Sequence, residues 1–160
     1  MTSRLLLIIP AILITGCEVS FDHDDETVAD APSAPAVEYL KAPGTETLEL
    51  PFSAAVRVGN TLYLSGALGY DPGLGGLVEG GIQAETQKTL ENISARLETF
   101  GSSMDKVVKC TVFLADISEW AAMNEVYVTL FPNKPARSAL GTSGLAMGAR
   151  VEIECIAVID

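Results

Sequence analysis

Histidine, cysteine and basic residues are all scarce in this sequence of 160 residues. It has one histidine, three cysteines, and ten lysines and arginines against 21 acidic residues, for a formal net charge of −11. A single histidine excludes a His-rich metal site within one chain, and three cysteines are too few for a disulfide scaffold of this size. Nucleic acids and anionic membrane surfaces attract basic patches, so the acidic balance argues against either as a partner.

Long hydrophobic runs are missing as well, because no stretch approaches the roughly 20 apolar residues of a membrane-spanning helix. The N-terminus instead has a cationic start at Arg4 and ten uncharged residues from Leu5 to Ile14, a length typical of the core of a secretory signal. The next residues, Ile14-Thr-Gly-Cys17, resemble the lipobox of bacterial lipoproteins. The resemblance implies removal of a signal peptide of residues 1–16 and lipidation of Cys17.

The lipobox resemblance also carries an expected location. Glu18, rather than Asp, follows the cysteine; by the sorting rule of such lipoproteins this implies a bacterial cell envelope protein, anchored to the outer membrane and facing the periplasm. Membrane contact is then expected only through the lipid anchor. Two alternatives to a lipoprotein signal remain. One is an ordinary signal peptide with an incidental cysteine, and the other is a buried apolar segment.

Residues 18–36 are predicted to be a disordered linker. They hold six acidic residues, no lysine or arginine, and the run Ala-Pro-Ser-Ala-Pro. High charge with few apolar residues cannot support a packed core. The single histidine, His23, lies among these acidic residues and is interpreted as a solvated linker residue, with metal scavenging as the alternative. No metal site is expected in the folded domain, which is predicted to span residues 37–160.

The domain alternates strand-like and helical patterns. Strands are expected at 54–58, 61–64, 106–114, from 135, and at 150–159, with helices at 82–100 and from Asp116 or Ser118 to Phe131. This order predicts an α+β fold with one mixed β-sheet covered on one face by two helices. The glycine-rich stretch 69–81 lacks a phosphate-binding motif and is interpreted as a surface loop.

The uncovered sheet face is expected to be too apolar to remain in water. The residues assigned to it are Val107, Phe113, Ile156 and Val158. Such a face predicts oligomerisation.

Few residues of the domain suit catalysis. With no histidine in it, Ser-His-Asp and Cys-His arrangements are excluded. Cys110 and Cys155 lie in the middle of strands and are interpreted as buried, inert thiols. They could pair in an extracytoplasmic domain, provided that their Cα atoms lie within about 7 Å of each other.

Arg137, Glu152 and Glu154 form the remaining charged set, on the last two strands. One interpretation is a structural Arg–Glu bridge. The other is a pocket in which Arg137 binds a substrate carboxylate while a glutamate holds a water molecule nearby, since a guanidinium matches a carboxylate in bidentate fashion.

Several segments resemble the RidA (YjgF) family. They are Pro51 to Gly66, Gln87-Lys-Thr-Leu-Glu-Asn92, Val107 to Leu114, Asn124-Glu-Val-Tyr127, and, most specifically, Pro135-Ala-Arg137-Ser with Val151-Glu152-Ile-Glu-Cys-Ile-Ala157. The resemblance implies a chorismate-mutase-like α+β fold and homotrimers with pockets between subunits. It also implies a reactive intermediate imine/enamine deaminase activity, which hydrolyses 2-iminopropanoate, 2-iminobutanoate and similar 2-imino acids to 2-oxo acids and ammonia.

The same resemblance implies roles for individual residues, with no cofactor or metal. Arg137 would bind the substrate carboxylate, and Glu152 would position the water and assist proton transfer. The other expected pocket residues are Phe52, Ser65, Gly66, Asn124 and Ala139. Phe52 stands where the archetypal deaminases have a tyrosine, and Ala139 where a cysteine is common. The alternative to an enzyme is a non-catalytic binding module for small carboxylates.

Overall fold

A computed structural model describes residues 34–159, apart from 46 and 48. The described residues belong to one compact unit that begins at Ala34. The expected signal peptide, Cys17 and nearly all of the acidic linker lie outside the described residues.

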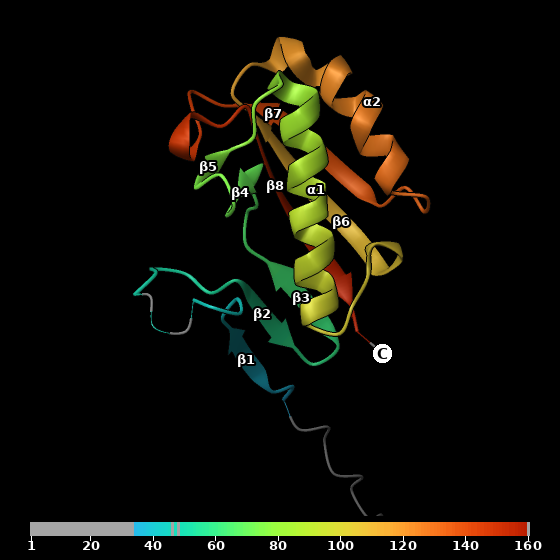
Figure 1. The fold of residues 1–160 in the computed structure, drawn as a ribbon. Helices are drawn as coiled ribbons and strands as arrows, with labels where there is room; N and C mark the ends of the chain where they lie inside the picture. Colours follow the sequence, from blue (N-terminus) through green and yellow to red (C-terminus); the bar gives the residue numbers. More distant parts are fainter. Residues whose placement is uncertain (1–33, 46, 48, 160) are drawn as a thin grey trace, which may run out of the picture. The chain divides into compact units, whose positions relative to one another are not determined.

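A six-stranded sheet and two long helices make up this unit (Figure 1). The strands of the sheet are, in spatial order, β1 (Val37–Leu40), β2 (Ala55–Val58), β3 (Thr61–Leu64), β8 (Val151–Val158), β6 (Val107–Leu114) and β7 (Ala136–Gly141). The helices are α1 (Gly81–Thr99) and α2 (Trp120–Leu130). β4 (Tyr70–Asp71) and β5 (Gly76–Leu77) form a separate small hairpin, and three short 3₁₀ turns complete the unit.

The sheet is mixed because β6 and β7 run parallel, whereas the other neighbours are antiparallel. Both long helices lie on the same face of it (Figure 1). This confirms the prediction of an α+β fold with one mixed sheet covered on one face. The sequence missed β1 and the β4–β5 hairpin, which are short and have no periodic pattern.

The core lies between the two helices and the sheet. Leu90, Ile93 and Leu97 recur on one face of α1 and are fully buried, each stabilising the fold by about 2 kcal/mol. The helix ends as predicted, because Gly101 adopts a left-handed conformation (φ +81°). The Ser102 N–H then donates to the Leu97 carbonyl at 2.8 Å, which completes a Schellman-type stop.

A β-bulge at the start of β6 overturns one expectation about the uncovered face. The pairing with β8 shifts between Val107 and Lys109, so that one extra residue enters β6. Val107 is therefore buried in the core, and Val108 is 47% exposed. The predicted Val107 does not lie on the uncovered face. Phe113, Ile156 and Val158 do, because they alternate with buried residues.

Cys110 and Cys155 form a disulfide, which corrects their interpretation as free thiols. They are directly paired across β6 and β8, with Cα atoms 4.1 Å apart. Both side chains are buried. The two cysteines are 45 residues apart in the sequence. The disulfide lowers the entropy of the unfolded chain and so stabilises the fold by about 4 kcal/mol at most.

In the described part of the chain, no helix is both long and apolar enough to cross a membrane.

Candidate functional site

Arg137 projects from β7 onto the helix-covered face of the sheet. It is paired with Cys110 in the parallel β6–β7 ladder, and paired residues share a face. One terminal nitrogen (Nη1) donates to Oδ1 of Asn124 at 2.7 Å. The guanidinium carbon lies 4.5 Å from the ring centre of Tyr127 and 5.6 Å from that of Trp120. Three side chains of α2 thus fix the orientation of the charge.

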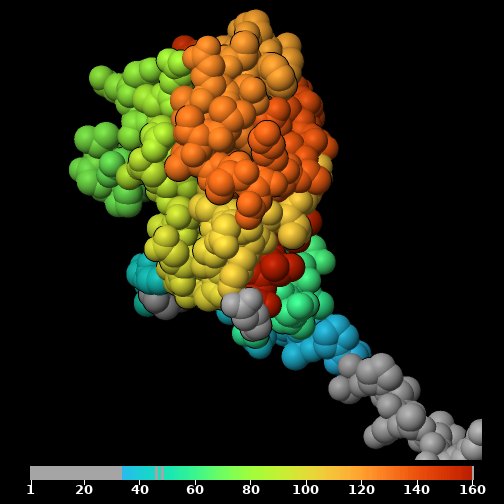
Figure 2. Space-filling model, turned by 90° about the vertical axis from the view of Figure 1, so that its right-hand side faces the viewer, coloured from blue at the N-terminus to red at the C-terminus, as the bar shows by residue number. Residues whose placement is uncertain are grey.

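A hollow of about 330 Å³ opens beside this guanidinium. Its lining residues come from α2 and from the segment that leads into β7: Asn124, Tyr127, Val128, Phe131, Lys134, Pro135 and Arg137. These two parts of the chain form one continuous surface, drawn in orange in Figure 2. The cation is therefore within reach of a small anionic molecule, as the pocket hypothesis requires.

Trp120 and Tyr127 were missed as site residues because the sequence placed them on the apolar face of the second helix. With Asn124 they follow a spacing of i, i+4 and i+7, which aligns them on one side of α2. The Tyr127 hydroxyl is buried and has no hydrogen-bond partner among the described residues. Burial raises the pKa of Tyr127 to about 12, although the nearby charge of Arg137 opposes the increase.

Glu152 lies on β8 and packs against Gly66, in the loop that follows β3. A Cβ built at Gly66 would overlap the Glu152 carboxylate, so this close approach requires a glycine. Any larger residue there would displace the carboxylate. Gly66 thus leaves open the space that the Glu152 carboxylate occupies.

Ser65 and Phe52 border a second hollow, with a volume of about 450 Å³. The Ser65 hydroxyl donates to the Ser53 carbonyl at 2.6 Å, and the Ser65 N–H donates to the Ala54 carbonyl at 3.1 Å. These bonds hold the loop, whereas the Phe52 ring is 59% exposed. This hollow is thus bordered by a fixed loop and an uncovered aromatic ring.

Arg137 and Glu152 do not share a pocket within one chain. Cys155 is paired with Cys110 and shares its face, which is also the face of Arg137. Glu152 is three residues from Cys155 and therefore points to the opposite face. Within one chain the sheet therefore separates these two side chains.

The structural Arg–Glu bridge is not present either. No carboxylate within the described residues forms an ion pair with Arg137. Ala139 lies two residues further along β7, on the same face as Arg137 and partly buried against the core. Glu154 is exposed on the face of Glu152.

Neither hollow offers a metal centre. Among residues 34–159 that the structure describes, no three His, Cys, Asp or Glu side chains lie close enough to hold an ion.

Comparison with known proteins adds an independent finding. Residues 43–159 match the model of the family described as Endoribonuclease L-PSP. A relative from Mus musculus, named 2-iminobutanoate/2-iminopropanoate deaminase, is 45% identical over 109 residues, which are 68% of this chain and 81% of the relative.

Two solved structures are similar as well. RidA from an Antarctic Psychrobacter bacterium has a TM-score of 0.66 and 39% identity, over 79% of this chain and 98% of that one. E. coli TdcF with bound serine has a TM-score of 0.65 and 29% identity, over 76% of this chain and 94% of that one.

Proposed function

The chain belongs to the RidA/YjgF family, described as Endoribonuclease L-PSP, and on that premise we propose that it hydrolyses small 2-imino acids to 2-oxo acids and ammonia. The observation that carries this proposal is Arg137, a fixed guanidinium that borders a hollow and has no carboxylate partner among the described residues. Relatives named as 2-iminobutanoate/2-iminopropanoate deaminases support the choice of substrate class.

Arg137 is proposed to bind the substrate carboxylate. A guanidinium has five N–H donors, and Asn124 accepts from one terminal nitrogen. The remaining donors can hold a carboxylate in bidentate fashion. Because Asn124 and two aromatic rings already fix the group, little side-chain freedom is lost on binding.

Glu152 is proposed to hold the attacking water and to move its proton. The water oxygen bonds to C2 of the imine while one water proton passes to Glu152, and Glu152 delivers that proton to the imine nitrogen to give a carbinolamine. Glu152 then takes the hydroxyl proton and passes it to the amine nitrogen, so that the C2–N bond breaks, ammonia leaves and the carbonyl forms. One water is consumed for each oxo acid and ammonia. An imine is already electrophilic, so no cofactor or metal is required.

The complete site is proposed to form between two copies of the chain in a homotrimer. One copy supplies Arg137, Asn124 and Ala139, and its neighbour supplies Glu152, Gly66, Ser65 and Phe52. The uncovered sheet face supports association, because Tyr63, Leu140 and Val158 expose 46%, 42% and 37% of their surface there. A face of this kind favours burial against another copy.

Subunit complementation tests the site and the activity together. Arg137→Ala and Glu152→Ala are each expected to lose turnover of 2-iminopropanoate generated in situ. Trimers reassembled from an equal mixture of the two variants should regain activity, since about a quarter of the sites then combine both intact residues. An inactive mixture would contradict the shared site. An inactive wild-type protein would contradict the deaminase itself.

A binding module for small carboxylates is the second candidate, and Phe52 favours it. Where the deaminases of the family carry a tyrosine, this exposed ring has no hydroxyl to offer a substrate. Saturable binding of 2-oxobutanoate without turnover of the imine would select this function. RNA cleavage is not proposed, because the chain has a net charge of −11.

We also propose that the protein is exported and anchored to the envelope, in the outer membrane, through a lipid on Cys17. The disulfide between Cys110 and Cys155 supports this, because such bonds persist in oxidising compartments. Labelling with a lipid precursor should mark the wild-type chain and not Cys17→Ala. Equal labelling of the two proteins, or none of the wild type, would overturn the anchor.

A further inference from the structure

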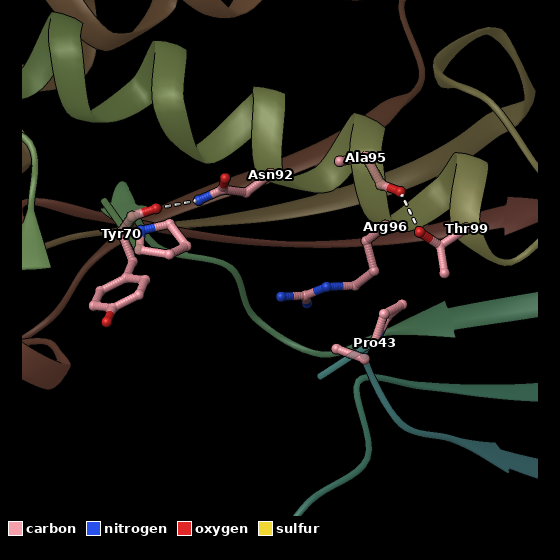
Figure 3. Close-up of a pocket in the computed structure, with 8 residues that line it drawn as sticks. Pro43, Tyr70, Asn92, Ala95, Arg96 and Thr99 are labelled. Carbon is pink, nitrogen blue, oxygen red and sulfur yellow. Dashed lines mark hydrogen bonds between the residues drawn. The ribbon is translucent and has the colours of Figure 1, made fainter. Parts of the chain in front are cut away.

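A third hollow, of about 330 Å³, shares no lining residue with the hollow beside Arg137 and is drawn in Figure 3. One side of it is α1, which contributes Asn92, Arg96 and Thr99 at a spacing that places them on one helix face. The other sides are Pro43, Tyr70 and Pro72. The Arg96 side chain extends from α1 into the hollow (Figure 3).

The charge of Arg96 is not neutralised within the described part of the chain. Its Nη1 donates to the Ser65 carbonyl at 2.9 Å, and no described carboxylate pairs with it. Burial lowers the pKa of Arg96 from its usual value, which reflects the cost of desolvating the cation. A half-buried guanidinium with unused donors is stabilised by an anion.

Two of the four described arginines have a carboxylate partner. Arg57 pairs with Glu38 at 4.0 Å, and Arg150 pairs with Glu119. Only Arg96 and Arg137 lack a carboxylate among the described residues, and both border a hollow. The reasoning that assigns a ligand carboxylate to Arg137 therefore applies to Arg96 on its own observations.

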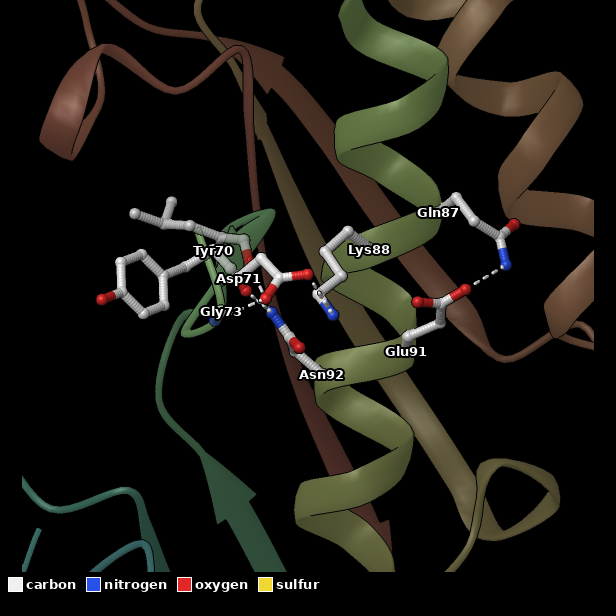
Figure 4. Close-up of polar contacts among 8 residues, drawn as sticks. Tyr70, Asp71, Gly73, Gln87, Lys88, Glu91 and Asn92 are labelled. Atoms are coloured by element: carbon white, nitrogen blue, oxygen red, sulfur yellow. Dashed lines mark hydrogen bonds and ion pairs between the residues drawn. The ribbon is translucent and has the colours of Figure 1, made fainter. Parts of the chain in front are cut away.

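The wall opposite Arg96 is fixed in place before any ligand arrives. Asn92 donates to the carbonyls of Leu68 and Tyr70, both at 2.9 Å. Lys88 forms an ion pair with Asp71 at 3.3 Å, and the Asp71 carboxylate accepts from the Gly73 N–H at 2.8 Å. These contacts hold the β4–β5 hairpin against α1 (Figure 4). A wall held in this way adds little ordering cost to binding.

We propose that Arg96 anchors a second anion site, which binds an organic monocarboxylate with a small apolar body. The guanidinium matches the carboxylate, whereas the rings of Pro43, Pro72 and Tyr70 suit an apolar body. Both Asn92 amide hydrogens are already donated to backbone carbonyls. A single cation in a partly buried hollow favours a monoanion over a dianion such as phosphate.

Benzoate is a suitable probe, with neutral benzamide as its control. Titration calorimetry is done on the full chain carrying Arg137→Ala, so that the other guanidinium does not contribute. We expect saturable benzoate binding that Arg96→Met weakens roughly tenfold to a hundredfold. The benzoate affinity of the Arg96→Lys protein should lie between those of the protein that retains Arg96 and the Arg96→Met protein. Benzamide should bind far more weakly than benzoate.

Thr99→Glu gives a second test without removing Arg96. Thr99 is exposed and lies three residues from Arg96 on α1, so a glutamate there supplies a competing carboxylate. Benzoate affinity should fall in Thr99→Glu and persist in the uncharged Thr99→Gln. Absence of saturable binding in the Arg137→Ala protein, or equal affinity in the Arg96→Met protein, overturns the site. The benzoate test does not depend on the proposed deaminase activity, because binding is measured without turnover.

Discussion

The hollows at Arg137 and Arg96 are similar in size but differ in how each holds its cation. Both have volumes of about 330 Å³, and in both a guanidinium lacks a carboxylate among the described residues. Arg137 is held by one amide oxygen and two aromatic rings of α2. Arg96 is held by one backbone carbonyl, that of Ser65. A cation fixed by three side chains suits a reaction that needs orientation, whereas a less restrained cation suits binding alone.

The largest expected difference between the two arginines is in catalysis. Arg137→Ala should lower kcat/KM for 2-iminopropanoate roughly a hundredfold, because it removes a charge-assisted contact worth about 3 kcal/mol. Arg96→Ala should lower kcat/KM only about threefold, because it removes the hydrogen bond to the carbonyl of Ser65, the residue before Gly66. Steady-state kinetics measure both values. Similar losses in the two variants would contradict the division of roles.

Asn124→Ala should reduce kcat/KM about tenfold by releasing the Arg137 guanidinium. The lost hydrogen bond to Oδ1 measures 2.7 Å and is worth about 1.4 kcal/mol. Asn124→Asp is the matched variant, since it keeps an acceptor but neutralises the cation and should raise KM further. If Asn124→Asp were as active as the wild type, Arg137 would not be the carboxylate-binding group.

Phe52→Tyr is expected to raise deaminase activity by about threefold, because it adds one hydroxyl to a ring that is 59% exposed. Phe52 also borders a smaller hollow with Arg96, so the same variant checks whether the two sites are separate. Benzoate affinity, measured in the Arg137→Ala background, should not change. A parallel change in affinity and activity would indicate one connected site.

The smallest effect is expected at alkaline pH and involves Tyr127. Its pKa is raised from 10.0 to about 12 in the folded chain. The raised pKa means that the folded state keeps its proton when the unfolded state has lost it, so stability falls as pH rises from 10 to about 12. Tyr127→Phe keeps the ring under Arg137 and should lack this decline. Chemical denaturation across that range makes the comparison, and parallel curves would contradict it.

The parts of the fold that sequence could predict are those set by local chemistry. The spacing of Leu90, Ile93 and Leu97 predicts α1, and Gly101 predicts where it ends. The alternation in β8 is equally regular, and its buried residues are the predicted ones. Each of these patterns depends only on neighbours a few residues apart.

The features that sequence could not give depend on register between distant strands. The bulge beside Val108 shifts one residue of β6 against β8, and no local pattern marks it. Pairing of Cys110 with Cys155 requires two strands separated by 45 residues to meet at one position. The motif residues identified Arg137 and Glu152, but their opposite directions follow only from the ladders on either side of β6.

The division of Arg137 and Glu152 by the sheet has a consequence for how the protein would behave when diluted. A solitary copy carries every proposed catalytic side chain and still encloses no working centre. Turnover per milligram should therefore decline once the concentration drops below that at which copies dissociate. Under this proposal activity requires assembly, and a dissociated chain is inactive although it is fully folded.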